Sequence, residues 1–152
     1  MKKKKVLFVC VHNSARSVMA EAMLNQLCGD FYEAQSAGLK PTDSTVVNPL
    51  VVAVLAEDGI DVSAYKPRHV FDVVKMGQIL THVIAVCDGA NAEKCPIFPG
   101  VTQRLHWGFP DPSALQGTWE EKLAATREIR DQIKDQIERE FCAQNCPLEK
   151  AT

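Results

Sequence analysis

The chain has 152 residues, of which 46% are hydrophobic and 24% charged, a composition typical of one globular domain with an ordinary core. A formal net charge of −2 argues against general nucleic-acid binding, so any attraction for an anion has to be local. No stretch reaches the length of a membrane span, and the apolar run after the basic start is too short for a signal peptide. We therefore expect a cytoplasmic protein whose six cysteines are reduced, reactive or metal-binding rather than a static disulfide framework.

The first predicted strand covers residues 6–9, a short apolar run with the β-branched and aromatic bias of a buried strand. Helical spacing follows over residues 17–28, and we expect this helix to end on a left-handed cap at Gly29. The loop between them, which we expect to bind an oxyanion, consists of Cys10, Val11, His12, Asn13, Ser14, Ala15 and Arg16.

Strands and helices alternate along the rest of the chain. The further strands are expected at 32–36, at 82–87 and within 101–107; the further helices run from the Asn48 cap to Gly59, lie within 70–80, and begin at a Thr118 capping box. The last helix has one apolar face, made of Leu123, Thr126, Ile129, Ile133, Ile137 and Phe141. This alternation predicts a single-domain α/β fold, with an open parallel four-stranded sheet and helices on both faces. Residues 142–152 are expected to form a mobile tail.

The residue types of the first loop suit the binding of an oxyanion. The loop ends on a helix N-terminus, where unpaired N–H groups and the positive end of the helix dipole favour an anion and a cysteine thiolate. Arg16 offers a planar fork for two oxygens of a tetrahedral anion, and the Ser17 hydroxyl is expected to donate to the Cys10 sulfur. Asn13 tolerates left-handed backbone in a tight loop. The loop therefore predicts a nucleophilic Cys10 at the base of an anion cradle.

These residues carry a family resemblance. Cys-x5-Arg-Ser after an N-terminal strand, followed by Met19-Ala20-Glu21, resembles the low-molecular-weight protein tyrosine phosphatases and the arsenate reductases built on the same fold. The resemblance runs from about Lys5 to about Phe141 and implies the phosphatase-like fold for nearly the whole chain. The chain differs from the usual loop pattern at His12 and Ala15.

Cys87 and Cys95 favour the reductases over the phosphatases. Together with the later His106-Trp107-Gly108-Phe109, they resemble the thioredoxin-coupled arsenate reductases, whose three cysteines correspond to Cys10, Cys87 and Cys95. Reduction of arsenate to arsenite takes two electrons, the number released when two thiols form a disulfide. The resemblance implies a thiol adduct on Cys10, attack by Cys87, and a final Cys87–Cys95 disulfide regenerated by thioredoxin. Arsenate is the expected ligand, with phosphate or sulfate as analogues.

By resemblance, Asp111 corresponds to the general acid of both the phosphatases and the arsenate reductases. The phosphatases follow this position with aromatic residues that hold a phosphotyrosine ring, whereas residues 113–115 here are Ser-Ala-Leu. A phosphatase that uses Cys10, Arg16 and Asp111 alone is the second interpretation. The third is a protein that binds oxyanions or senses redox state without turnover.

Other polar and sulfur side chains are expected to play no part in the chemistry. Asn13, Glu21 and Ser36 resemble a potassium site of some relatives, but Arg68 stands near the place of its fourth, acidic group. We therefore expect no metal site and no cofactor. Cys28 is assigned to helix packing, and Cys142 and Cys146 to the mobile tail, where they are expected to do no chemistry.

Overall fold

The computed structural model describes residues 3–42, 44–87, 100–101 and 103–143. Its strands are β1 (Lys4–Cys10), β2 (Tyr32–Gly38), β3 (His82–Ala85) and β4 (Gln103–His106). Its helices are α1 (Arg16–Cys28), α2 (Pro49–Glu57), α3 (Val70–Lys75) and α5 (Trp119–Ile137), with a 3-10 turn η1 (Pro112–Ala114) and a π-helical turn η2 (Glu138–Cys142) that continues α5.

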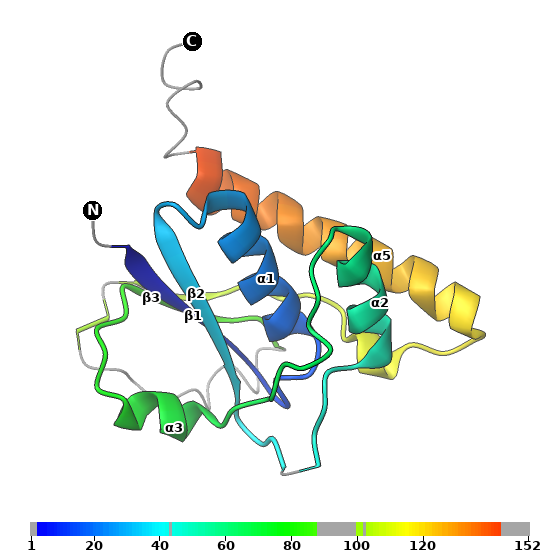
Figure 1. Ribbon diagram of the computed structural model, residues 1–152, viewed down its shortest axis with the longest axis horizontal. Coiled ribbons are helices and arrows are strands. Elements are labelled where there is room, and N and C mark those ends of the chain that lie inside the picture. Colours follow the sequence, from blue (N-terminus) through cyan, green and yellow to red (C-terminus); the bar gives the residue numbers. More distant parts are fainter. Residues whose placement is uncertain (1–2, 43, 88–99, 102, 144–152) are drawn as a thin grey trace.

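The four strands form one parallel sheet in the order β2-β1-β3-β4. Figure 1 shows α1, α2 and α5 over one face of the sheet and α3 on the other, as a parallel α/β fold requires. Side chains of β1 alternate between two apolar clusters, with Phe8 and Cys10 facing α1 and Leu7 and Val9 facing α3. The predicted fold class is confirmed.

Local sequence signals explain where the helices begin. The Asn48 side chain accepts the Leu50 N–H at 2.9 Å, so it caps α2 ahead of Pro49. Thr118 and Glu121 form the predicted capping box at the start of α5. All six residues of the predicted apolar face of the last helix are buried.

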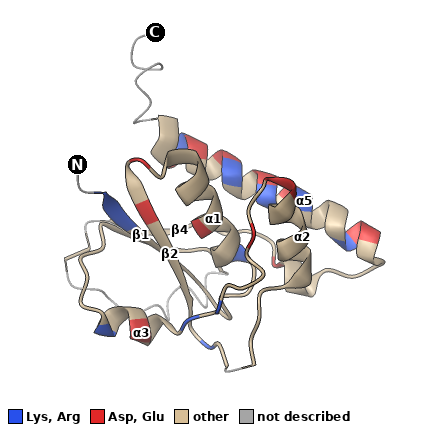
Figure 2. Cartoon of the chain, in the orientation of Figure 1, with Lys and Arg blue, Asp and Glu red and all other residues tan. Residues whose placement is uncertain are grey.

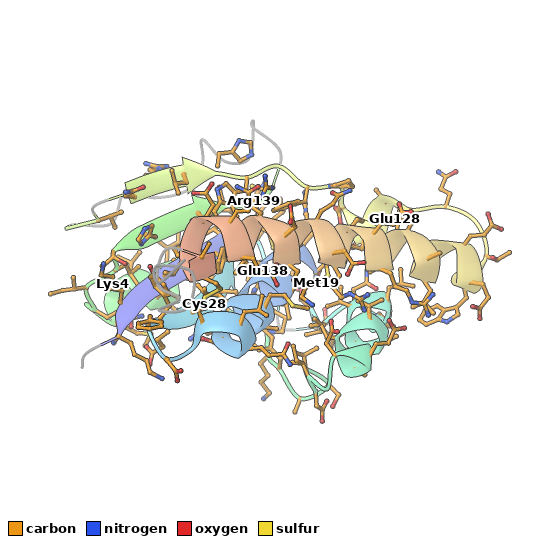
Figure 3. The ribbon with its side chains drawn as sticks, turned by 90° about the horizontal axis from the view of Figure 1, so that it is seen from above. Lys4, Met19, Cys28, Glu128, Glu138 and Arg139 are labelled. Carbon is orange, nitrogen blue, oxygen red and sulfur yellow. A yellow bond between two sulfur atoms is a disulfide. The ribbon has the colours of Figure 1, made fainter. Side chains whose placement is uncertain are left out.

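Two expectations near α1 are wrong. Gly29 lies at φ −64°, so it is not a left-handed cap; a Cβ there would approach the Asn25 carbonyl oxygen to 2.3 Å, and this close approach is what requires glycine. Cys142 belongs to η2 rather than to a mobile tail, and it forms a disulfide with Cys28 with a Cα–Cα distance of 5.6 Å. Figure 3 shows Cys28 beside the end of the C-terminal helix. The expectation that Cys28 only packs is corrected accordingly, whereas the expectation that Cys142 takes no part in the reaction stays a prediction.

Charges of both signs are distributed along α5, whereas α1 carries few (Figure 2). Among the residues that the structure describes, none of the helices is long and apolar enough to cross a membrane.

Candidate active site

Cys10 is the last residue of β1, at the carboxyl edge of the sheet, and its side chain is 3% exposed. Its sulfur lies 2.8 Å from the Ser17 hydroxyl and accepts the Asn13 backbone N–H at 3.2 Å. Hydrogen bonds that a sulfur accepts favour its ionised form. The structure therefore brings together Cys10 and Ser17 as the sequence predicted.

Asn13 fixes the shape of the loop. It is fully buried and has a left-handed φ of 56°, a conformation that asparagine tolerates better than most residues. Its amide nitrogen donates to the Ser17 and Ser36 hydroxyls at 2.9 and 3.0 Å. Its amide oxygen accepts the Arg68 backbone N–H at 2.8 Å and the Tyr65 hydroxyl at 3.1 Å. One side chain thus ties the loop to α1, β2 and the connector before α3.

The end of β2 supports the loop from the side. The Leu39 N–H donates to the Cys10 carbonyl at 3.0 Å, and the Lys40 N–H donates to the Val11 carbonyl at 2.7 Å. A Cβ on Gly38 would lie 2.8 Å from the Asn13 nitrogen, so only glycine allows the two backbones to approach this closely.

Arg16, the first residue of α1, is 9% exposed by its side chain and reaches the segment after β4. Its guanidinium donates to the Phe109 carbonyl at 3.2 Å and lies 3.5 Å from the Asp111 carboxylate. Asp111 also accepts the Ser113 N–H at the start of η1, which fixes its side chain. The predicted anion-binding cation and the predicted acid are therefore neighbours.

Cys87 is fully buried and lies two residues beyond β3, the strand next to β1. The Val86 N–H donates to the Val9 carbonyl at 2.8 Å, which holds this segment beside the end of β1. Cys10 and Cys87 belong to the same apolar cluster. The His106 ring nitrogen contacts the Cys87 carbonyl, a contact that sequence reasoning missed.

A buried polar cluster lies behind the loop. Ser36 donates to the Glu21 carboxylate at 3.3 Å and contacts the Tyr65 hydroxyl. Burial raises the pKa of Glu21 to about 7, although the nearby Arg68 guanidinium, 3.8 Å away, acts to lower it. Burial and the charge of Glu21 also raise the pKa of Tyr65. Sequence reasoning missed Tyr65, because a single tyrosine in an irregular connector carries no pattern.

The side chains of this cluster do not fit a potassium ion. The Asn13 amide oxygen already accepts two hydrogen bonds, and a guanidinium lies beside the Glu21 carboxylate. In the described part of the chain there is also no group of three or more His, Cys, Asp or Glu side chains that suits a metal.

Two of the predicted residues lie outside the described residues. They are Cys95, the third cysteine of the expected relay, and Cys146 of the expected tail. Of the anion loop, His12 is exposed, with its ring 3.4 Å from the Lys40 carbonyl, and Ala15 is buried.

Comparison with known proteins finds a family with this fold. Residues 5–145 match the family model of the low molecular weight phosphotyrosine protein phosphatases. An arsenate reductase of Bacillus licheniformis is 38% identical over 140 residues, which cover 91% of this chain and 96% of that protein.

Two solved structures are similar as well. An arsenate reductase in its phosphate-binding state has a TM-score of 0.68 and 30% identity, over 90% of this chain and 95% of that one. A thioredoxin-dependent arsenate reductase of Corynebacterium glutamicum has a TM-score of 0.61 and 28% identity, over 91% of this chain and 63% of that one.

Proposed function

We propose that this chain, which belongs to the low molecular weight phosphotyrosine protein phosphatase family, reduces arsenate to arsenite through Cys10, Cys87 and Cys95. Within that family it belongs to the arsenate reductases. The observation that carries the proposal is the placement of two sulfurs. Cys10 ends β1, Cys87 lies just beyond the neighbouring parallel strand β3, and both belong to one apolar cluster.

The first step joins sulfur to arsenic. The Cys10 thiolate attacks the arsenic atom of arsenate, an As–O bond breaks, and the oxygen leaves as water after taking a proton that we assign to Asp111. The Arg16 fork holds two of the remaining oxygens and offsets their charge. The 3.5 Å ion pair keeps this fork beside Asp111, so one side chain orients both the anion and the acid.

The next two steps move the electrons. The Cys87 thiolate attacks the Cys10 sulfur, the S–As bond breaks, and its electron pair remains on arsenic, which leaves as arsenite. The Cys95 thiolate then attacks the Cys87 sulfur and releases the Cys10 thiolate. Two thiols have lost the two electrons that arsenic gained, and the product on the protein is a Cys87–Cys95 disulfide.

A dithiol protein is the expected reductant of that disulfide. We propose thioredoxin, since the similar Corynebacterium glutamicum protein is thioredoxin-dependent. A dithiol restores both cysteines by two successive exchanges, with one disulfide lost and one gained. A cytoplasmic location, where thiols are kept reduced, suits this partner and is part of the proposal.

The test is arsenate turnover with thioredoxin, thioredoxin reductase and a nicotinamide donor. We expect Cys10→Ser, Cys87→Ser and Cys95→Ser each to abolish arsenite formation, while the matched control Cys146→Ser turns over normally. Full turnover by Cys87→Ser would contradict the relay.

The same proteins separate the alternatives. The Cys10, Arg16 and Asp111 arrangement also suits a phosphatase, so aryl phosphate hydrolysis is measured alongside. Efficient hydrolysis that survives loss of Cys87 and Cys95, without arsenite formation, would favour the phosphatase. Arsenate binding with no arsenite above background would favour an oxyanion-binding protein.

A further inference from the structure

The reaction scheme makes no use of Glu21, a carboxylate on α1 with a side chain only 16% exposed. Its counter-ion is Arg68, from the connector between α2 and α3, with the guanidinium 3.8 Å away. A mostly buried carboxylate needs such a partner to stay ionised. Arg68 touches the catalytic loop as well, because its backbone N–H donates to the amide oxygen of Asn13 at 2.8 Å.

The backbone bond from Arg68 fixes the direction of the Asn13 amide. A backbone N–H only donates, so the atom that it meets is the amide oxygen, and the amide NH2 faces Ser17 and Ser36. Each of these hydroxyls therefore accepts a hydrogen from Asn13 and has one hydrogen of its own left to give. The hydrogen of Ser17 is directed at the Cys10 sulfur, 2.8 Å away.

The hydrogen of Ser36 has two acceptors within reach, the Glu21 carboxylate at 3.3 Å and the Tyr65 hydroxyl, which itself donates to Asn13. The charge of Glu21 decides between them. An ionised carboxylate only accepts, so Ser36 donates to it and keeps its oxygen for the Asn13 NH2. A protonated Glu21 would instead donate to Ser36 and compete with Asn13 for that oxygen. Hydrogen bonds in such a chain strengthen one another, so the charge on Glu21 affects the bonds that end on Cys10.

We propose that Arg68 is a positioning residue for Cys10: its guanidinium acts as a built-in cation beside Glu21, and its backbone N–H orients Asn13, so that the hydroxyl of Ser17 donates to the sulfur. At the residues that resemble the potassium site of some relatives, this chain supplies the positive charge itself. The proposal rests on the proposed function only in treating Cys10 as the nucleophile.

Charged and titratable groups face this cluster and the loop from several elements, among them His12 of the loop, whose ring contacts the carbonyl of Lys40 after β2. Glu21 faces Arg68 and the Tyr65 hydroxyl of the same connector. At the loop, Arg16 from α1 carries the positive charge, and it is itself paired with Asp111 of the segment after β4.

The test is the alkylation of Cys10 by iodoacetamide in the intact protein as a function of pH, read from the Cys10 peptide by mass spectrometry. For Arg68→Ala we expect the pH of half-maximal rate to rise by about half a unit, because loss of the cation favours protonated Glu21. Arg68→Lys, which keeps the charge, is expected to restore most of the difference. Free guanidinium ion at non-denaturing concentration is expected to restore Arg68→Ala, and sodium chloride at equal ionic strength is not.

Controls separate this role from a general effect on folding. Arg127→Ala removes the same group from an exposed ion pair with Glu57 and is expected to leave the alkylation profile unchanged. Glu21→Gln is expected by itself to raise the pH of half-maximal alkylation. Arg68→Ala is expected to cause no further rise when Glu21 is already replaced. If Arg68→Ala does not fold, as judged by circular dichroism, Glu21→Gln carries the test alone.

Three results would overturn the proposal. The first is an unchanged pH of half-maximal Cys10 alkylation in folded Arg68→Ala or in Glu21→Gln. The second is an additive shift when the two substitutions are combined. The third is a wild-type alkylation profile that differs between potassium and sodium chloride at equal ionic strength. Alkylation needs no arsenate, so these results are independent of turnover: a protein that reduces arsenate normally with an unchanged Arg68→Ala profile refutes the role of Arg68 alone.

Discussion

The two ends of α1 treat sulfur in opposite ways. At its N-terminal end the Cys10 sulfur lies 2.8 Å from the Ser17 hydroxyl and accepts the backbone N–H of Asn13. At its C-terminal end Cys28 is closed in a disulfide with Cys142, in the same apolar cluster as Tyr32 and Phe141. Both cysteines are buried, so exposure does not distinguish them.

The difference shows that the neighbours of a cysteine, more than its burial, decide what the sulfur can do. Polar neighbours surround the sulfur that we propose as the nucleophile, while a covalent partner makes the other a link between α1 and η2. The site end is expected to control activity and the disulfide end to control stability. Substitutions at the two ends test this difference.

The largest effect is expected at Arg16. Arg16→Lys keeps the charge but loses the planar fork that contacts Asp111 and Phe109 and that we propose binds two oxygens of the anion. We expect kcat/KM for arsenate to fall by about a hundredfold or more, measured with thioredoxin as reductant. Arg127→Lys, in an exposed ion pair on α5, is the matched control. A loss of kcat/KM below about threefold in Arg16→Lys would contradict the role of Arg16 as the anion-binding residue.

Removal of the disulfide should produce the opposite pattern. The link joins positions 114 residues apart, so Cys28→Ser with Cys142→Ser is expected to lower the free energy of unfolding by about 4 kcal/mol. Urea denaturation without reductant measures this loss. Arsenate turnover below the new unfolding midpoint is expected to stay at the wild-type rate, and a loss of turnover comparable to that of Cys87→Ser would erase the distinction between the two ends.

Two asparagines allow the same comparison within polar side chains. Asn13→Ala removes a buried side chain with four hydrogen bonds from left-handed backbone, and we expect a loss of about 3 kcal/mol in urea together with loss of activity. Asn25→Ala removes two bonds to the Ala34 backbone at the other end of α1, and about 1 kcal/mol is expected with activity kept. Equal losses from the two would mean that the loop network adds no special stability.

The most pH-dependent effect is expected at Glu21. Its pKa in the folded protein, about 7, lies above its ordinary value of 4.5, so the folded state resists its ionisation. The free energy of unfolding should therefore fall by up to about 3 kcal/mol as the pH rises from 4.5 through 7. Glu21→Gln lacks this fall, and its stability relative to wild type should rise over that range.

Glu57 provides a control of opposite sign. Hydrogen bonds from Arg127 and Arg130 lower its pKa, so its contribution is present above its ordinary pKa and is lost as the pH falls. The stability of Glu57→Gln relative to wild type should thus improve only in acid. A Glu21→Gln difference that stays constant with pH would contradict the raised pKa of Glu21.

Much of the fold follows from local pattern. The apolar run of β1, the Asn48 cap and the capping box at Thr118 each act over a few residues, so the sequence indicates them directly. The closeness of Cys10 and Ser17 was predictable for the same reason, since only one short loop separates the end of β1 from the start of α1.

Long-range partners were not predictable. Nothing near Cys28 in the sequence indicates a bond to a residue 114 positions away. Tyr65 and the backbone of Arg68 contact Asn13 from an irregular connector, where hydrophobic periodicity gives no signal. The Gly29 cap was wrong because close approach to Asn25, rather than a positive φ, requires that glycine.

The central claim, that electrons pass from Cys87 and Cys95 through Cys10 to arsenic, is tested most directly by mapping cysteine peptides by mass spectrometry after one arsenate turnover without reductant. The account predicts one new Cys87–Cys95 disulfide for each arsenite released, with Cys10 again a thiol and Cys28–Cys142 unchanged. Arsenite released while Cys87 and Cys95 both remain thiols would contradict it.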